Sequence, residues 1–342
     1  MNSVIENDSQ DILRRVDVRK LRGKKILITG ASGFLGQCLA ATLAHANREK
    51  ELGAKIDCVG FRKAPPLLAS LVRRDKKISY RRVDLSKPFQ LRGYDYIFHA
   101  AGYGQPAKFI ADPLSLVKIN VDATANLLAG SPKATFVFFS SGAVYGDVPV
   151  KLLPVREDYN GNCDLRSPRS VYAEAKRLGE TLCAAYKEKM GVDTKIVRIF
   201  HVYGPGLSSS DKRVMSEFIR KALVEKKIQL LDAGKAVKTY GYIADVVSMI
   251  LYVALHGKET VYNVGGRDSI SIRELAEKIG KYCKVPVAVP KVSSRLRHIG
   301  KDPAVIKLDL RRITREMKKF SFTPFSKGLA RTIEWTNARL TE

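Results

Sequence analysis

The stretch KKILITGASGFLG, residues 24–36, joins a short apolar run to a glycine-rich turn. The run is rich in β-branched residues and is typical of a buried parallel strand. The glycines recur every third residue where a helical segment opens, so the backbone can turn sharply and approach a pyrophosphate beside the helix N-terminus. A turn with no ligand is the alternative. We expect cofactor contacts from Gly30, Gly33, Phe34, Leu35 and Gly36.

Strand-like and helical segments continue to alternate as far as about residue 206. Repeated βα units of this kind predict an α/β fold with a Rossmann-type, doubly wound parallel sheet. Beyond that point the pattern loosens into separate helices with short strands between them. We therefore expect an N-terminal extension (1–20), a dinucleotide-binding domain that carries the catalytic residues (21–206), and a smaller C-terminal α/β substrate lobe (207–342) interleaved with it.

No run approaches the roughly 18 apolar residues that a membrane span needs, and the first residues are too polar for a signal-peptide core. These features predict a cytoplasmic protein with no membrane span. The five cysteines are scattered, without the close pairs of zinc or redox sites. We therefore expect reduced thiols and no metal site.

Sixty Lys and Arg residues against 34 Asp and Glu give a net charge of +26. Such a charge can attract nucleic acid, an acidic membrane surface or a phosphorylated substrate. The basic clusters at residues 14–25 and 291–319 do not interleave aromatic residues, as single-strand binders do. We interpret most of the basic residues as a solvated surface. A few of them are expected to bind phosphate groups. Nucleic acid is the least favoured partner.

Two further segments are expected to line the cofactor. Asp84 follows a strand-like run and is placed to accept a hydrogen bond from the adenine amino group, with Leu85 beside the ring. Ala100 and Ala101 follow the next strand-like run, DYIFH. Because parallel strands end at the same edge of a sheet, these residues are predicted to lie near the glycine turn.

The end of the second strand bears on the choice between NAD and NADP. A fold that selects NAD usually carries an acidic residue there, which accepts hydrogen bonds from the ribose hydroxyls. Gly60 stands at this place, and Arg62 and Lys63 follow it, which suits a 2′-phosphate. The cofactor is therefore NAD or NADP, with NADP favoured. Ordinary surface charge is the alternative for the two basic residues.

A serine and a Tyr-x-x-x-Lys pair carry the acid–base chemistry. Ser141 ends the apolar run ATFVFFSS, as a strand does when it delivers a hydroxyl to a crevice. Tyr172 and Lys176 stand four residues apart in a helical stretch, so they share one face. A lysine cation there lowers the phenol pKa from its usual value of about 10, toward that of a base working near pH 7. The spacing alone is common in ordinary helices.

Together, TGASGFLG, Ser141, Tyr172 with Lys176, and RIFHVYGPG (198–206) resemble the extended short-chain dehydrogenase/reductase superfamily, specifically its nucleotide-sugar epimerase/dehydratase family. The resemblance implies a nucleoside-diphosphate sugar in the C-terminal lobe and hydride removal, usually at sugar C4, onto the bound nicotinamide. Tyr172 would take the hydroxyl proton, Ser141 would hydrogen-bond that hydroxyl, and Lys176 would also hold the nicotinamide ribose. A homodimer through the helices that carry Asn120 and Tyr172 is implied as well.

The residues after Ser141 depart from the family pattern. The 4,6-dehydratases carry Asp-Glu directly after the catalytic Ser/Thr, and the UDP-glucuronate decarboxylases carry a Glu two residues after it. This chain has Gly142 and Ala143, which cannot exchange a proton. A 4-epimerase is therefore the simplest prediction. The alternatives are decarboxylation or dehydration with a loop acid such as Glu157 or Asp158, and NADPH-dependent 4-keto reduction.

The expected substrate contacts are spread over both lobes. His201 stands where the family usually has an Asn on the substrate diphosphate, and Lys238 stands where it usually has an Arg. Both changes keep hydrogen-bond donors. The full set of expected substrate contacts is Ser141, Gly142, Ala143, His201, Arg213, Lys238 and Arg297. A non-catalytic, dinucleotide-sensing protein that uses its basic surface on nucleic acid is the alternative from another class, and the intact serine, tyrosine and lysine argue against it.

Overall fold

A seven-stranded sheet forms the centre of the larger lobe, in a computed structural model that describes residues 3–207, 211–290 and 307–340. The strand order is β10-β6-β5-β4-β1-β2-β3, and every neighbouring pair is parallel. The predicted Rossmann-type, doubly wound sheet is thereby confirmed. Its strands are β1 (Lys25–Thr29), β2 (Lys55–Gly60), β3 (Ile78–Arg82), β4 (Tyr96–His99), β5 (Thr135–Ser141), β6 (Asp193–Ile199) and β10 (Val261–Val264).

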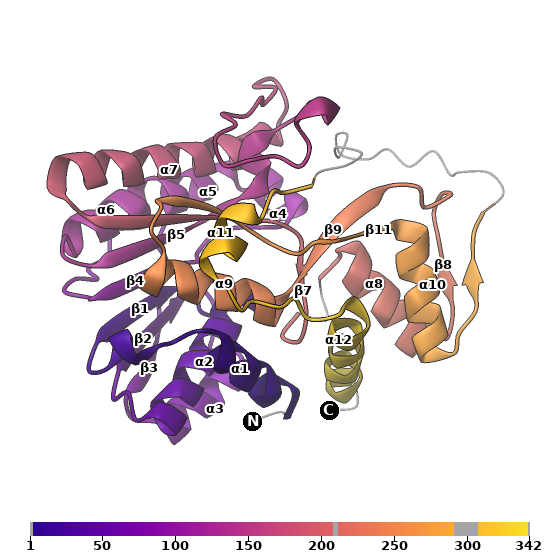
Figure 1. Ribbon diagram of the computed structural model, residues 1–342, viewed down its shortest axis with the longest axis horizontal. Helices are drawn as coiled ribbons and strands as arrows, with labels where there is room; N and C mark the ends of the chain where they lie inside the picture. Colours follow the sequence, from indigo (N-terminus) through magenta and orange to yellow (C-terminus); the bar gives the residue numbers. More distant parts are fainter. Residues whose placement is uncertain (1–2, 208–210, 291–306, 341–342) are drawn as a thin grey trace.

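Helices cover both faces of this sheet (Figure 1). Alternate residues of a strand point to opposite faces: Ile26 and Ile28 of β1 join one hydrophobic core, and Leu27 joins the other. Burial on both faces explains why the strands are almost continuously apolar. One face carries α4 (Pro106–Ala111), α5 (Pro113–Asn120), α6 (Asp122–Gly130) and α7 (Ser170–Met190), and the other carries α2 (Phe34–Lys50), α3 (Pro66–Arg74) and α9 (Ile243–His256).

The segment expected to be an N-terminal extension forms a helix, α1 (Ser3–Arg15), that packs on α2 and α9. Ile5 and Ile12, one heptad apart, are buried in the main core. Asp8 on the same helix is also buried, and its carboxylate accepts hydrogen bonds from Tyr242 (2.8 Å) and Arg331 (2.6 Å). Helix α1 is therefore an integral layer of the fold.

A smaller lobe lies beside the large sheet in Figure 1, and most of its elements come from the chain beyond residue 206, although its strand β7 precedes that residue. This lobe contains a three-stranded sheet, β11-β9-β7, and a two-stranded sheet, β12-β8. Strand β10 and helix α9 belong to the larger lobe, so the chain after residue 206 contributes elements to both lobes. The remaining elements are β7 (Val202–Tyr203), α8 (Val214–Arg220), β8 (Ile228–Gln229), β9 (Val237–Tyr242), β11 (Asp268–Ser271), α10 (Ile272–Cys283), β12 (Val287–Ala288), α11 (Arg311–Glu316) and α12 (Phe325–Leu340).

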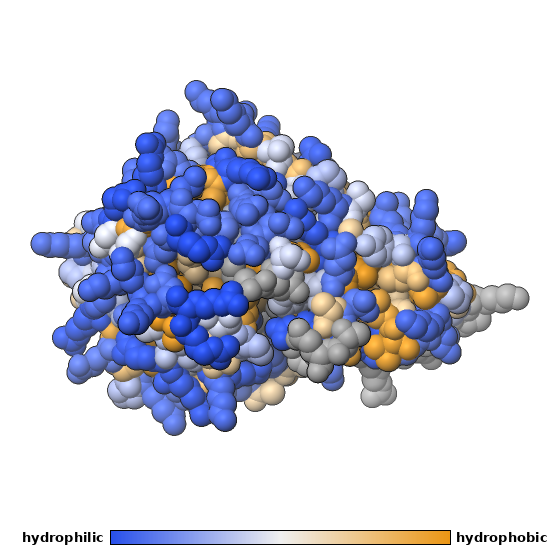
Figure 2. Space-filling view, turned by 90° about the horizontal axis from the view of Figure 1, so that it is seen from below, coloured by the Kyte–Doolittle hydropathy of each residue, from blue (hydrophilic) through white to orange (hydrophobic). Residues whose placement is uncertain are grey.

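The surface is rich in charge, as the sequence requires. In Figure 2, hydrophilic side chains cover most of the face that is shown, and hydrophobic ones gather in a patch toward the narrower end. All five cysteines are free thiols, and three of them are buried. Within the described residues, no helix is both long and apolar enough to cross a membrane, and no group of His, Cys, Asp or Glu side chains is arranged to hold a metal ion.

Candidate active site

The glycine turn between β1 and α2 lies directly against the end of β4. Gly30 has a φ of +65°, and a Cβ atom there would lie 2.6 Å from the carbonyl oxygen of Ala100 and from the nitrogen of Ala101. A Cβ atom on Gly36 would collide with the Gly30 carbonyl oxygen. Only glycine allows these segments to touch, so the turn is as tight as a dinucleotide site requires.

The N-terminus of α2 opens this turn without a capping side chain. Gly33 is the N-cap residue, so no N-cap side chain accepts a hydrogen bond from the first N–H groups of the helix. Phe34 and Leu35 follow as the first helical residues and are partly buried. Uncapped N–H groups and the positive end of a helix dipole suit a pyrophosphate, so these residues fit a dinucleotide.

The end of β2 is lined by basic and hydroxyl groups. Gly60 is its last residue, and a Cβ atom there would lie 2.6 Å from both Ser32 Oγ and the Tyr80 hydroxyl. Arg62 and Lys63 are exposed on the loop that follows. Arg82 of β3 stands opposite Gly60 in the sheet register. The sequence analysis missed Arg82, because its place beside Gly60 depends on the β2–β3 pairing.

Asp84 and Leu85 come directly after β3, near the same edge of the sheet. The Asp84 carboxylate accepts hydrogen bonds from the backbone N–H (3.0 Å) and hydroxyl (2.7 Å) of Ser86. These hydrogen bonds hold the turn in place, and both are accepted by the same Asp84 oxygen, Oδ1. Leu85 is buried. A role for either residue toward adenine stays a prediction.

Ser141 and Tyr172 meet at the carboxyl edge of the large sheet. Ser141 is the last residue of β5, and Tyr172 lies in the first turn of α7. The Ser141 hydroxyl lies near enough to the Tyr172 phenol to lower its pKa, and Ser141 Oγ accepts a hydrogen bond from the Ala143 N–H at 3.2 Å. The Tyr172 ring stacks on Phe109 of α4, with centroids 5.0 Å apart. The structure thus brings together the two hydroxyls that the sequence analysis paired.

Lys176 lies one helical turn after Tyr172 and is buried. Its Nζ donates to the Phe139 carbonyl oxygen at 2.5 Å and lies 4.8 Å from the centre of the Phe138 ring. Burial lowers the pKa of Lys176 to about 7, although the nearby Glu180 carboxylate raises it. Burial likewise raises the pKa of the Tyr172 phenol, and the nearby Ser141 hydroxyl opposes that rise. A small change in the surroundings of Lys176 or Tyr172 would therefore alter the fraction of that side chain that is protonated.

Asn120 is a polar residue of this site whose position the sequence pattern did not define. Its side chain is fully buried at the end of α5, and its amide donates to the Leu116 carbonyl oxygen at 2.8 Å. Among the described residues, the Asn120 Oδ1 atom has no hydrogen-bond partner. A Cβ atom on Gly102 would lie 3.7 Å from this atom and 3.6 Å from Lys176 Nζ. The loop after β4 therefore passes over both polar groups.

Two of the expected substrate contacts, His201 and Lys238, are associated with strand β9. A Cβ atom on Gly142 would collide with the Phe200 ring, which packs against the His201 ring at 4.2 Å. His201 adopts a φ of +24°, and its carbonyl oxygen accepts the Gly241 N–H, so it is tied to strand β9. Lys238 also lies on β9. Arg297 lies outside the described residues.

The two loop acids considered as substitute proton donors are engaged elsewhere. Glu157 is buried, accepts the backbone N–H of Asn263 at 3.0 Å and faces Arg312 at 3.6 Å. Asp158 is exposed and pairs with Arg156 at 3.0 Å. Neither contact involves Ser141 or Tyr172. A proton-transfer role for either acid therefore gains no support from its contacts.

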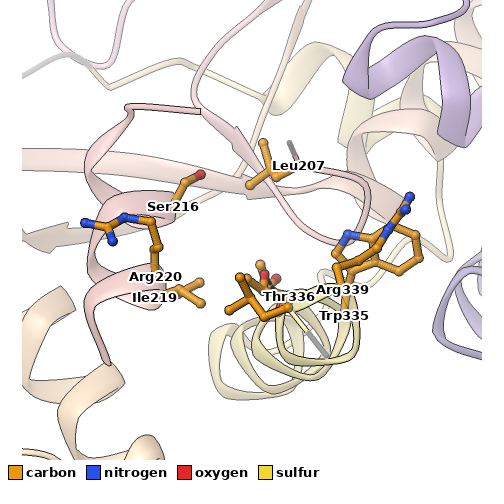
Figure 3. A pocket seen from close by; sticks show the side chains of 9 residues that line it. Leu207, Ser216, Ile219, Arg220, Trp335, Thr336 and Arg339 are labelled. Carbon is orange, nitrogen blue, oxygen red and sulfur yellow. Dashed lines mark hydrogen bonds between the residues drawn. The ribbon is translucent and has the colours of Figure 1, made fainter. Parts of the chain in front are cut away.

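Two hollows lie away from these residues. One, between α8 and α12, is lined by Ser216, Arg220 and Trp335 among others and encloses about 30 Å³, room for about one water molecule. In Figure 3, Ser216, Ile219 and Arg220 come from α8 on one side of the hollow, and Trp335, Thr336 and Arg339 come from α12 on the other. A larger hollow of about 380 Å³ lies between the ends of α2 and α3, at the amino edge of the strands. Neither contains a residue of the candidate site.

A dinucleotide-binding parallel sheet that carries Ser141, Tyr172 and Lys176 at its carboxyl edge defines an extended short-chain dehydrogenase/reductase. A model of the NAD dependent epimerase/dehydratase family matches residues 26–265. The chain belongs to this family and is an NAD-dependent enzyme of its kind.

Relatives and solved structures agree with this assignment. The chain is 28% identical over 319 residues to UDP-glucuronic acid decarboxylase 1 of Xenopus tropicalis, covering 93% of this chain and 73% of that protein. It is 29% identical over 272 residues to UDP-glucuronic acid decarboxylase 6 of Arabidopsis thaliana, covering 79% and 77%. The UDP-N-acetylglucosamine 4-epimerase of Methanobrevibacter ruminantium superimposes with a TM-score of 0.78 at 22% identity, covering 93% and 99%. A dTDP-glucose 4,6-dehydratase from Streptomyces venezuelae does so with a TM-score of 0.76 at 23% identity, covering 93% and 98%.

Proposed function

We propose that this enzyme oxidises C4 of a nucleoside-diphosphate sugar and that its reaction is the decarboxylation of UDP-glucuronate. The observation that carries the first part is the proximity of the Ser141 hydroxyl to the Tyr172 phenol, with Lys176 one helical turn further along α7. The glycine turn and the α2 N-terminus would hold the dinucleotide, which when bound accepts hydride from the sugar and returns it.

The three side chains divide the proton chemistry. Tyr172 takes the proton from the C4 hydroxyl as the carbonyl forms, and Ser141 holds that hydroxyl in line with the phenol. The Lys176 cation stabilises the phenolate, and each unit by which it lowers the Tyr172 pKa is worth about 1.4 kcal/mol. A buried charge is poorly screened, which strengthens this effect, but burial also lowers the pKa of Lys176 to about 7, so only part of the lysine is charged near neutral pH.

Decarboxylation follows from C4 oxidation by ordinary carbonyl chemistry. A 4-keto glucuronate is a β-keto acid, so the C5–C6 bond can break with its electron pair moving toward the C4 carbonyl oxygen. Carbon dioxide leaves, C5 takes a proton from water, and hydride returns to C4. The bond cleavage needs no carboxylate at Gly142 or Ala143. The relatives that the chain matches are UDP-glucuronic acid decarboxylases. This similarity favours decarboxylation over the simple 4-epimerisation that the sequence predicted.

The 4-epimerase stays the second candidate, and a specific observation favours it. Ala143 stands where decarboxylases of this family carry a glutamate, and the loop acids Glu157 and Asp158 are engaged in other contacts. Epimerisation requires only that the 4-keto sugar turn over before hydride returns. The two reactions share every step up to the ketone.

Incubation with UDP-glucuronate and NAD separates these candidates. We expect carbon dioxide release and a UDP-pentose, detected by mass spectrometry, and no conversion of UDP-glucose to UDP-galactose. Conversion of UDP-glucose with no carbon dioxide from UDP-glucuronate would instead establish the epimerase. An enzyme that turns over neither sugar, although it binds both, contradicts the proposal.

We also propose that the enzyme uses NADP at least as well as NAD, and that it forms a homodimer. Arg62, Lys63 and Arg82 surround the end of β2, where a 2′-phosphate would lie.

The proposed homodimer rests on exposed apolar side chains. Helices α5 and α7 pack together, and Leu114 and Leu178 on them are 75% and 46% exposed, which suits burial against a second copy. Light scattering that gives the mass of one chain would contradict the dimer.

A further inference from the structure

Glu180 lies one helical turn after Lys176 on α7. Side chains four residues apart on a helix are neighbours, with Cβ atoms about 5–6 Å apart. Both side chains reach the end of β5. Lys176 Nζ donates to the Phe139 carbonyl oxygen at 2.5 Å, and Glu180 Oε1 accepts the hydroxyl of the next residue, Ser140, also at 2.5 Å. The Glu180 side chain is 11% exposed, so a largely buried carboxylate lies beside the buried lysine.

An arginine from the neighbouring strand holds this carboxylate. Arg198 lies on β6 and stands opposite Ser140 in the sheet register. Its guanidinium donates to both Glu180 oxygens, from Nε at 3.0 and 3.2 Å and from Nη2 at 2.7 Å. Its Nη1 donates to the Glu157 carbonyl oxygen at 2.9 Å, and its central carbon lies 4.8 Å from the centre of the Tyr145 ring. The Glu180 carboxylate is therefore fixed between α7 and the sheet.

Three other titratable side chains lie near Lys176, and all are neutral near pH 7. The His99 ring packs on Phe138, with centres 5.9 Å apart, and Lys176 Nζ lies 4.8 Å from the same Phe138 ring. Burial lowers the pKa of His99 to about 3. Burial raises the pKa of the Cys183 thiol, two turns further along α7, and that of the Tyr172 phenol, one turn before. None of the three supplies a negative charge to Lys176.

We propose that Glu180 is a positioning residue that keeps Lys176 positively charged, and that Arg198 holds the carboxylate in place for this task. The inference deepens the proposed function and rests on it for the action of the lysine cation on Tyr172. A buried lysine on its own tends toward the neutral amine, whereas an opposite charge within about 4–6 Å favours the ammonium. The Lys176 pKa of about 7 is the balance between burial, which lowers it, and Glu180, which raises it.

A purely structural ion pair is the alternative reading of Glu180 and Arg198. The pair joins α7 to β6, and breaking a buried pair is destabilising whichever member is removed. The two members differ in sign, however. Loss of Glu180 removes a negative charge, so Lys176 should lose its proton at lower pH. Loss of Arg198 removes a positive charge and cannot have that effect by electrostatics. The direction of the shift therefore separates the two roles.

The test follows the charge of Lys176 by NMR, without substrate or turnover. Lysine labelled with carbon-13 at Cε gives signals that move when the amine loses its proton, and exposed lysines titrate far higher, at about pH 10.4. The wild type should show a signal that is absent from Lys176→Arg and has a midpoint near pH 7. Glu180→Gln keeps an oxygen for Ser140 and Arg198 but removes the charge, so it should lower this midpoint by about one pH unit or more. Arg198→Met should not lower it.

Glu174→Gln is the matched control, because Glu174 lies on the same helix but is 40% exposed and pairs with Arg177 at 3.5 Å. It should leave the Lys176 midpoint unchanged. Glu180→Gln and Arg198→Met each leave a buried charge without its partner, so urea unfolding is measured for both. The double variant removes both charges and decides the question where a single variant does not fold. It should still lower the midpoint, because Glu180 is the nearer charge to Lys176.

Shifts of the same sign and size in Glu180→Gln and Arg198→Met would show that the pair acts through structure alone. That result, or an unchanged midpoint in Glu180→Gln or in the double variant, overturns the inference and leaves the proposed reaction standing. As a second readout, the alkaline limb of the pH profile for turnover of UDP-glucuronate should move to lower pH in Glu180→Gln. A wild type that releases no carbon dioxide from UDP-glucuronate, although Glu180→Gln lowers the midpoint, contradicts the proposed function and leaves the effect of Glu180 on Lys176 intact.

Discussion

The two walls of the candidate site are held by contacts of different reach along the chain. On the catalytic wall, Ser141 and Tyr172 are placed by the end of β5 and by α7, which pack through apolar residues and through the Glu180 carboxylate, bonded to Ser140 and Arg198. On the substrate wall, strand β9 is anchored by buried charge. Tyr242 at its end donates to Asp8 of α1, and Arg331 of α12 donates to the same carboxylate. The first wall is local, whereas the second depends on both ends of the chain.

A second buried contact repeats this arrangement just after β9. Asp245 accepts Arg15 at 2.7 Å and the Thr323 hydroxyl at 2.6 Å. Arg15 lies in α1, and Thr323 lies just before α12. Buried charges stabilise a structure only when each has a partner, so loss of one member is expected to cost more than an exposed pair would. The stability of the substrate wall should therefore depend on the protonation of its buried carboxylates, Asp8 and Asp245.

The largest effect is expected on the catalytic wall. Tyr172→Phe removes the phenol but keeps the ring stacked on Phe109, so folding and cofactor binding should stay intact. Turnover should fall by about 100-fold or more, because a positioned acid–base group is lost. Steady-state kinetics, with fluorescence titration of NADH as the control, measures both. Near-normal turnover in this variant would refute the assignment of Tyr172.

The next effect is expected on the substrate wall and depends on pH. Burial raises the pKa of Asp8 from 3.8 to about 6, although Tyr242 and Arg331 oppose the rise. Between these values the folded protein binds more protons than the unfolded chain. The contribution of Asp8 to the free energy of unfolding should therefore fall as the pH rises from about 4 to 6, by about 3 kcal/mol in all.

Urea unfolding of the wild type and Asp8→Asn, at several pH values over this range, measures that slope. The difference in unfolding free energy between the two proteins should shift in favour of Asp8→Asn as the pH rises. Asp11→Asn is the control of opposite sign, because Arg331 lowers the pKa of Asp11 despite its burial. A difference between wild type and Asp8→Asn that stays constant with pH would show that the network does not depend on this carboxyl.

A smaller effect is expected from a change of shape on the catalytic wall. A methyl group at Gly142 would collide with the Phe200 ring, so Gly142→Ala should lower the free energy of unfolding by about 1–3 kcal/mol. Turnover should fall as well, since Ser141 is the neighbouring residue. Gly104→Ala is the matched control, because a Cβ atom there meets nothing within 4 Å. Thermal unfolding that is the same for both variants would mean that Phe200 moves aside freely.

The sequence predicted the catalytic wall better than the substrate wall, for a physical reason. The glycine turn and Ser141 stand at strand ends, and Tyr172 and Lys176 share a helix face, so local periodicity places them. Helix α1 was taken as an extension, because its buried Ile5 and Ile12 are separated by polar residues whose partners lie more than 200 positions away. Arg82 was missed as a site residue, because its position beside Gly60 depends on strand register.

The smallest effect is expected at the adenine end of the catalytic wall, where the contacts are exposed. Arg62 is solvent-exposed beside Gly60, and an exposed pair with a phosphate is worth about 1 kcal/mol or less. Arg62→Ala should therefore weaken NADPH by about three- to fivefold and leave NADH unchanged. The difference should shrink at high salt, because the charges are screened by solvent ions. Calorimetry at low and high ionic strength measures it, with Arg22→Ala as a surface control, since the Arg22 side chain bonds the backbone at residues 50 and 51. Equal losses for NADH and NADPH would place Arg62 on a group that the two cofactors share, and the end of β2 would then carry no preference for the 2′-phosphate.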